Sequence, residues 1–361
     1  MRVLQARDAD EWVRLFYFRS DVVIEAMMLL LSALVIVFLA AQMFTNALEW
    51  IGERMGVSEG VTGSVFAAVG TAMPETIVPM VAVLGGGAAV EINHAVGMGA
   101  ILGAPFMLGT LSLGMMAYFA GRLRGWTDAF KPELTGFRRD INFFLVGYSM
   151  AVAVAFLPPA WQIVRVLAAL LLFIMYFLYL MATIRASQKL VTEGHATEAE
   201  HDLYGAKLFS ASTLIASLQL LLALIALVWG ARLFVAGAES MSELIGIAAL
   251  VVSLLIVPVA TELPEKVNSI LWIRRRRDTL AFGNITGAMV FQGTIIPAIG
   301  MLIMPWHIDS SYAVASVALA LSGVAWLWFL LKSERLTPVW LMGNAVLYGL
   351  FIVMVVVGGG R

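Results

Sequence analysis

Long apolar stretches separated by short polar turns run through most of the chain, and their lengths indicate helices that cross a lipid bilayer. A helix needs about 20 mostly apolar residues to cross the hydrocarbon core. Ten stretches fit this template, at residues 22–46, 60–84, 91–120, 140–157, 160–184, 209–236, 244–271, 278–304, 311–331 and 337–358. We therefore predict an all-α integral membrane protein with about ten transmembrane helices.

The composition supports a membrane protein and narrows the range of partners. Of the 361 residues, 61% are hydrophobic and 13% are charged, whereas soluble domains are about half apolar and a quarter charged. The net charge of −1 gives no reason to expect a nucleic-acid partner. The expected partners are membrane lipids and inorganic cations, and the sequence leaves the oligomeric state open. The absence of cysteine excludes disulfides and thiolate metal sites.

Lysine and arginine gather in the loops that follow the odd-numbered stretches. These residues are Arg54, Arg122, Arg124, Lys131, Arg138, Arg139, Arg185, Lys189, Lys207, Arg274 to Arg277, Lys332 and Arg335. Because basic loops stay in the cytoplasm, we predict that these loops are cytoplasmic and that both termini lie outside. Four arginines in the N-terminal segment favour the opposite orientation. We expect the plasma (inner) membrane as the location.

The chain contains an internal repeat. With a shift of 190 residues, region 41–75 aligns with 231–265 without a gap and with ten identities, which include a Pro-Glu pair in each copy. An odd number of stretches separates the copies, so they point in opposite directions through the membrane. We predict two inverted five-helix repeats, an architecture typical of secondary transporters. The predicted parts are an N-terminal interfacial segment (1–21), a first repeat (22–184), a cytoplasmic linker (185–207) and a second repeat (208–361).

The first copy places a carboxylate inside an apolar stretch, in the segment GTAMPETIVPM. Pro74 cannot bond the carbonyl of Gly70 and clashes with it, so this carbonyl is freed. Thr71 and Glu75 are four residues apart and face the same side of a helix. One helix thus offers a hydroxyl, a carbonyl and a carboxylate together, which suits a cation. A carboxylate that only locks the bundle through hydrogen bonds is the plainer alternative.

The second copy repeats this pattern in VATELPEK. Thr261 and Glu265 are again four residues apart, and Pro264 again interrupts the helix between them. Glu262 adds a third carboxylate on roughly the same face. Lys266 lies close to it in the sequence, so a structural ion pair is an alternative role for Glu262. The two threonines could also bond back to their own helices.

At these residues the sequence resembles the sodium/calcium exchanger family of cation antiporters, which carries a G-T-S-x-P-E and a G-N-x-x-G-S-N motif in each repeat. The matching residues are Gly70, Thr71, Pro74, Glu75, Gly99, Gly103, Thr261, Pro264, Glu265, Gly283, Asn284 and Gly287. The departures are Ala72, Ala100, Ala104, Pro105, Ala260, Glu262, Ala288 and Met289. The glycines also have a simpler explanation, since small residues let membrane helices approach closely.

The resemblance implies antiport of cations, with Ca²⁺ and Na⁺ as the expected ions and H⁺ as a further possibility. In the family, the glutamates, the Thr/Ser group and the second asparagine of each G-N-x-x-G-S-N motif line the ion sites. The predicted ligands here are Glu75, Glu265, Thr71, Thr261, Glu262 and Asn284. Together with freed carbonyls and water they can supply the 6–8 oxygens that Ca²⁺ takes. The lost serine and asparagine oxygens favour the alternative, a cation/proton antiporter that does not carry calcium.

We therefore predict sodium/calcium exchange by alternating access around paired glutamates at the membrane midplane. No cofactor is expected. A receptor or scaffold that kept the fold is a second class, but it would not need buried carboxylates. An enzyme is not expected, because the chain lacks the zinc-binding H-E-x-x-H motif and has only four histidines.

Overall fold

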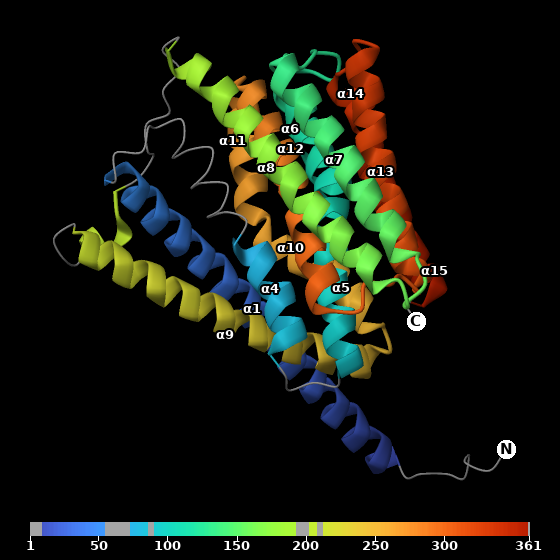
Figure 1. Cartoon of the computed structure of the whole chain (residues 1–361). Helices are drawn as coiled ribbons and strands as arrows, with labels where there is room; N and C mark the ends of the chain where they lie inside the picture. Colours follow the sequence, from blue (N-terminus) through green and yellow to red (C-terminus); the bar gives the residue numbers. More distant parts are fainter. Residues whose placement is uncertain (1–8, 55–72, 86–89, 193–201, 208–211, 360–361) are drawn as a thin grey trace.

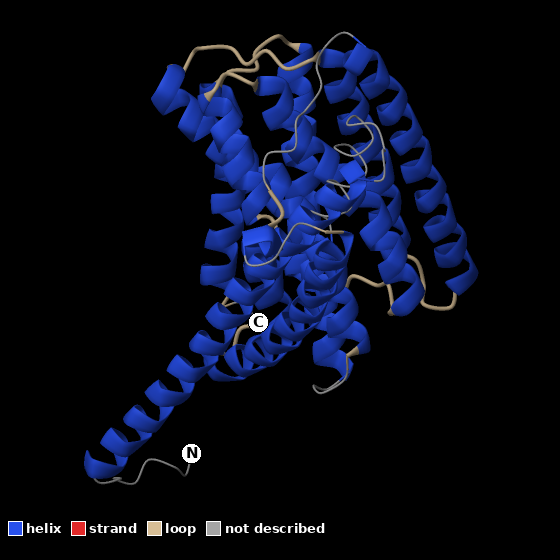
Figure 2. Ribbon diagram, turned by 90° about the vertical axis from the view of Figure 1, so that its left-hand side faces the viewer, coloured by secondary structure: helices blue, strands red, loops and turns tan. Residues whose placement is uncertain are grey.

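The structure is a computed structural model that describes residues 9–54, 73–85, 90–192, 202–207 and 212–359. Regular secondary structure within these ranges is helical throughout, as Figure 2 shows. The helices are Ala9–Arg54 (α1), Met73–Leu84 (α4), Val90–Met107 (α5), Leu113–Arg124 (α6), Leu134–Ala155 (α7), Gln162–Thr192 (α8), Thr213–Ile245 (α9), Ala249–Thr261 (α10), Leu263–Arg274 (α11), Asp278–Ile303 (α12), Ser311–Lys332 (α13), Pro338–Leu341 (α14) and Gly343–Gly358 (α15). The prediction of an all-α fold is confirmed.

Among the described residues, seven helical segments are long and apolar enough to cross a membrane. They are Ile24–Phe44, Val90–Arg124, Gln162–Ala186, Thr213–Leu244, Asp278–Ile303, Ser311–Lys332 and Pro338–Gly358. Of the other three predicted spans, 140–157 overlaps α7 and 244–271 overlaps α10 and α11. The span 60–84 overlaps the short apolar helix α4, and its residues 60–72 lie outside the described residues. Large apolar side chains on the outer faces of these helices, such as Ile163 and Val357, are exposed and suit contact with lipid. The predicted boundaries of the two repeats and the linker stay predictions.

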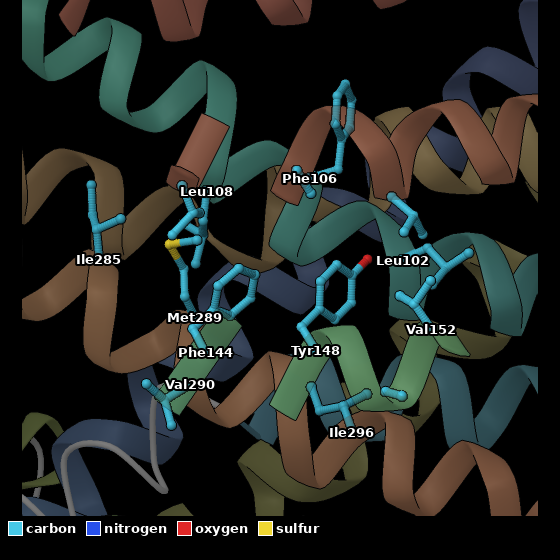
Figure 3. Close-up of a cluster of buried hydrophobic side chains, with 14 of the residues drawn as sticks. Leu102, Phe106, Leu108, Phe144, Tyr148, Val152, Ile285, Met289, Val290 and Ile296 are labelled. Atoms are coloured by element: carbon cyan, nitrogen blue, oxygen red, sulfur yellow. The ribbon is translucent and has the colours of Figure 1, made fainter. Parts of the chain in front are cut away.

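The larger apolar cluster joins α5, α7, α8, α12, α13 and α15. Figure 3 shows its centre, with labelled side chains from the three helices α5, α7 and α12. Phe106 of α5, Phe144 of α7 and Met289 of α12 are almost completely buried there. Because the interior is apolar, these helices hold each other mainly by close packing. This cluster packs against one side of the short helices α4 and α10.

A second apolar cluster joins the long helices α1 and α9 to α4, α5 and α10. In Figure 1 the helices α1 and α9 lie side by side and obliquely against the rest of the bundle. Two glycines of α9 allow this approach: a Cβ at Gly230 would lie 2.9 Å from Val37, and one at Gly237 would lie 2.8 Å from Leu30. The short helices α4 and α10 thus belong to this second cluster, while α5 and α10 contribute side chains to both clusters.

A π-helical turn, Leu108–Ser112 (η2), joins α5 to α6 within one continuous span. A π turn bonds each carbonyl to the amide five residues on and leaves the normal helical pattern locally disturbed. The buried Asn344 of α15 meets this turn: its Nδ2 donates to the carbonyl of Gly109 at 2.7 Å and to that of Gly323 at 2.9 Å. This one amide thus joins three spans.

Three basic loops meet at one end of the bundle. The loop after α6 bonds to the loop before α14, with Phe130 N donating to the Leu336 carbonyl at 2.9 Å. Arg124 bonds to Asp278 at 2.6 Å and also to the Ile273 carbonyl, which ties α6 to the arginine-rich turn after α11. Figure 1 shows these loops at its upper end and both marked chain ends toward the lower end.

The opposite end is held by a buried arginine. Arg165 of α8 is 2% exposed and donates to four carbonyls, those of Leu157, Pro158, Pro159 and Trp306. A guanidinium suits this task because it offers five donors in a fixed plane. The arginine therefore fixes the turn between α7 and α8 to the turn between α12 and α13.

Candidate cation-binding site

Glu75 is the first predicted ligand that the structure describes, and it is 4% exposed. It is the third residue of α4, and the helix ends nine positions later, at Leu84. At about 1.5 Å per residue this is about 14 Å, close to half of the ~30 Å hydrocarbon core. Pro79 follows four residues later and has no N–H to offer the carbonyl of Glu75. The first repeat thus presents a carboxylate and a proline-weakened helix turn near the midplane.

The second repeat is broken at Glu262. Helix α10 ends at Thr261, Glu262 is in a non-helical conformation (φ −100°, ψ 6°), and α11 begins at Leu263 with Pro264 in its first turn. Thirteen residues of α10 precede Glu262 and twelve of α11 follow it, so the break lies near the midplane. Figure 1 shows α4 running toward the lower end and α10 with α11 running the opposite way. Broken backbone at this depth is tolerated where protein or an ion satisfies it.

Glu262 is fully buried and forms an ion pair. Its Oε2 lies 3.1 Å from Nζ of Lys266, which is 5% exposed. The same Nζ donates to the carbonyl of Pro258 at 3.1 Å. The ammonium therefore lies at the C-terminal end of α10, where the helix dipole favours positive charge. The sequence offered this pair as the alternative role of Glu262, and the geometry agrees with it.

Thr261 is buried, and its hydroxyl donates to the carbonyl of Val257 at 3.2 Å. This is the back-bonded arrangement named above as an alternative, but a hydroxyl that donates its proton keeps its lone pairs for a cation. Thr261 also lines a small apolar cavity that includes Val78, one turn after Glu75 in α4. The remaining lining comes from Leu34, Val37, Phe234 and Val257. Residues of both repeats thus border one cavity.

Asn284 lies on α12 and is anchored to α11. Its Nδ2 donates to Oγ of Ser269 at 3.0 Å, and Ser269 in turn donates to the carbonyl of Ala281 at 3.2 Å. With its nitrogen held by Ser269, the amide has a defined orientation. Ser269 is a residue that the sequence reasoning missed. The sequence signal that could have identified Ser269 is its spacing, because it follows Glu265 by four residues, which is about one helical turn. Other polar residues in the same stretch made this signal weak.

Two predicted ligands cannot be placed in space. Thr71 lies outside the described residues. Glu265 belongs to α11, but its side chain lies outside those that the structure describes. Among the described side chains, no three carboxylates or histidines come together as metal ligands do. The structure thus brings Glu262, Lys266 and the end of α10 together, and it relates α4 to α10 through the cavity.

Close helix packing supports the geometry of the site. Ser253 of α10 donates to the carbonyl of Val96 in α5 at 2.7 Å. A Cβ at Gly99 would lie 2.9 Å from Cβ of Ser253, and one at Gly103 would lie 2.9 Å from Cγ of Pro258. These two glycines therefore let α5 and α10 approach closely, which is the simpler explanation that the sequence analysis gave for the glycines. In contrast, a Cβ at Gly283 would meet nothing within 4 Å among the described residues.

A helical membrane protein with two opposed repeats, each with a weakened helix and a buried acid near the midplane, defines the class of secondary transporters. The family model for the sodium/calcium exchanger protein matches residues 25–185 and 215–357, one match for each repeat. The chain belongs to the sodium/calcium exchanger family, and it is a cation antiporter of that family. Membership of a transporter family also confirms the prediction that the protein is not an enzyme.

Two relatives are similar to this chain over most of their length. The chain is 25% identical to the putative antiporter CaxA of Alkalimonas amylolytica over 308 residues, which covers 82% of this chain and 88% of the relative. It is 25% identical to the inner membrane protein YrbG of Escherichia coli (strain K12) over 283 residues, which covers 78% and 81% of the two chains.

Solved structures share the fold. A crystal structure of the H⁺/Ca²⁺ exchanger CAX superimposes with a TM-score of 0.67 at 18% identity, over 96% of this chain and 89% of that chain. The sodium-calcium exchanger NCX_Mj superimposes with a TM-score of 0.55 at 20% identity, over 92% and 99%. At these identities the likeness establishes the fold, and the ions have to be inferred from the site of this chain.

Proposed function

We propose that this antiporter exchanges calcium for sodium by alternating access around carboxylates at the membrane midplane. The observation that carries the proposal is the burial of Glu75 in the first turn of α4, near the membrane midplane, together with the helix break at Glu262 in the opposed repeat. A buried carboxylate at this depth is costly and is a functional feature by default. Two such features in opposed repeats support a common ion site.

Each predicted ligand has a role in this proposal. Glu75 and Glu265 supply the negative charge that balances the transported cation. Thr261 and Thr71 supply hydroxyl oxygens, and Asn284 supplies an amide oxygen whose orientation Ser269 holds. Glu262 acts together with Lys266 and adds no net charge. Backbone carbonyls at the break, and water, complete a coordination shell of the 6–8 oxygens that calcium takes.

We further propose that the end with the basic loops faces the cytoplasm, so that both termini lie outside, in the plasma (inner) membrane. The meeting of the loops after α6, α11 and α13 at one end supports this orientation, because basic loops stay in the cytoplasm. The relative YrbG is an inner membrane protein, which is consistent with the location.

The test is exchange by purified protein in lipid vesicles. Calcium uptake driven by an outward sodium gradient is expected in the wild type and is expected to be lost in Glu75→Gln and in Glu265→Gln, with both variants still folded. Glu91→Gln is the matched control, since Glu91 is an exposed carboxylate at the start of neighbouring α5. Uptake that is unchanged in both site variants would refute the proposed role of these glutamates.

A cation/proton antiporter that does not carry calcium is the second candidate. The Glu262–Lys266 pair favours it, because an ammonium inside the site reduces the negative charge available to a divalent ion. The same vesicles separate the two candidates. Absence of calcium uptake, together with sodium flux driven by a pH gradient, would identify the second.

A further inference from the structure

One polar feature near the midplane occurs in only one of the two repeats. With the shift of 190 residues, Glu262 aligns with Ala72 and Lys266 aligns with Thr76. The second repeat therefore carries both members of an ion pair, and the first repeat carries neither. At these two positions the second repeat has one negative and one positive charge that the first repeat lacks, and the two charges cancel.

The ammonium occupies a position that suits a bound cation. It lies 3.1 Å from the Glu262 carboxylate and 3.1 Å from the Pro258 carbonyl, at the C-terminal end of α10. In transporters with broken helices, half-helix ends and unwound carbonyls coordinate the coupling ion. Here a side chain of the protein itself fills such a position, and Lys266 is only 5% exposed.

Stability alone is a poor reason for this pair. A buried ion pair must repay the loss of hydration of both charges, and replacing such pairs by apolar residues is often neutral or stabilising. The first repeat does without it at the aligned positions. A charge-neutral pair placed at the helix break is therefore better explained by what it does to the charge of the site.

We propose that the Lys266 ammonium acts as a tethered cation that takes the place of one transported monovalent cation. The inference rests on the proposed function, because it concerns the charge of the same ion site. Lys266 cancels the charge of Glu262, its partner at 3.1 Å, so that Glu262 holds no transported ion. Without the lysine, Glu262 would hold one more monovalent cation in each transport cycle.

The experiment compares four forms of the full-length protein in vesicles whose membrane potential is clamped with potassium and valinomycin. They are the wild type, Lys266→Thr, Glu262→Ala, and the double variant, which carries the residues of the first repeat at both positions. Calcium uptake driven by sodium is measured at several potentials. If calcium is not carried, sodium uptake driven by a pH gradient is measured in the same way.

The charge moved per cycle by the wild type is the reference. Lys266→Thr leaves Glu262 to bind one more monovalent cation, so its exchange is expected to use one more coupling ion per cycle and to change the charge moved per cycle by one. Glu262→Ala leaves a buried ammonium without its counter-charge, and its exchange is expected to be lost. In the double variant, exchange is expected to return relative to Glu262→Ala and to move the same charge per cycle as the wild type.

Sodium binding in detergent gives a second measurement that does not depend on transport. Lys266→Thr is expected to be stabilised by sodium with one more bound ion than the wild type, because a ligand of the folded state stabilises it. If Lys266→Thr does not accumulate, Lys266→Gln removes the same charge with an uncharged side chain of similar reach.

The inference is overturned if the wild type exchanges cations but the Lys266 variants move the same charge per cycle and bind the same number of sodium ions. That result would assign the pair a purely structural role. If the wild type exchanges no cation under any gradient, the proposed function fails, and this outcome is distinct from the first.

Discussion

Gly103 of α5 lies directly against the carbonyl oxygen of Leu254 in α10, with Cγ of Pro258 close by. Pro258 has no N–H with which to bond this carbonyl. The contact therefore joins a weakened turn of the second repeat to the backbone of the first. A side chain at position 103 would overlap the Leu254 oxygen, so the approach of the two repeats depends on glycine here.

We expect Gly103→Val to separate α5 from α10 and to destabilise the protein. The added side chain meets backbone, which cannot move aside as a flexible side chain can, and overpacking of this kind costs about 1–3 kcal/mol. The measurement is the melting temperature of the purified protein in detergent. Gly349→Ala serves as the control, because a Cβ there meets nothing within 4 Å among the described residues. Equal melting temperatures of the two variants would contradict this account.

We expect Ser269→Ala to weaken cation binding while the protein stays folded. The substitution removes the hydroxyl that holds Nδ2 of Asn284 at 3.0 Å, so the amide loses its fixed orientation. Loss of a hydrogen bond of about 1 kcal/mol corresponds to roughly a fivefold loss of apparent affinity. The measurement is the cation concentration at half-maximal exchange. Ser333→Ala is the control, since Ser333 donates to Phe329 of its own helix; a loss as large in this control would show a general effect.

We expect Thr286→Val to destabilise the contact between α7 and α12. Oγ of Thr286 donates to Oδ2 of Asp140 at 2.8 Å, and Asp140 is 5% exposed. The valine leaves a buried carboxylate with one bond fewer, at a cost of about 1–3 kcal/mol. Thr183→Val is the matched control, because that hydroxyl donates to Tyr179 in its own helix. Thermal unfolding that is unchanged in Thr286→Val would argue against this role.

The absence of cysteine allows a direct test of orientation. Arg275→Cys places a thiol in the exposed turn after α11, and Asp309→Cys places one at the opposite end, where Asp309 is 83% exposed. In intact cells, a membrane-impermeant maleimide is expected to label position 309 and to label position 275 only after the membrane is opened. Labelling in the reverse order would invert the proposed topology.

Seven of the ten predicted spans match long apolar helices among the described residues, because the length and apolarity of a helix are local properties of the sequence. The burial of Glu75 was also predictable, since its neighbours on both sides are apolar and a proline precedes it. The twofold repeat was visible because acidic residues and prolines recur in register. These features need no knowledge of which helices touch.

The partners of the polar side chains were harder to predict. The bond between Ser269 and Asn284 joins two consecutive helices, and the bond between Asp140 and Thr286 joins helices far apart in the sequence. Neither follows from a local pattern, because each depends on the rotation of both helices. The same holds for glycine: Gly99 and Gly103 face a neighbouring backbone, whereas Gly283 faces open space among the described residues.

The π-helical turn at Leu108–Ser112 sets the register of everything that follows in the same span. In an α-helix each residue advances the chain by about 100°. Winding the same residues as a regular α-helix would swing the far half of the span by about that angle. Arg124 would then face away from Asp278, its partner at 2.6 Å, and the tie between the two repeats at the basic end would be lost. The π-helical turn thus absorbs one extra residue, so that both halves of the span keep facing their separate partners.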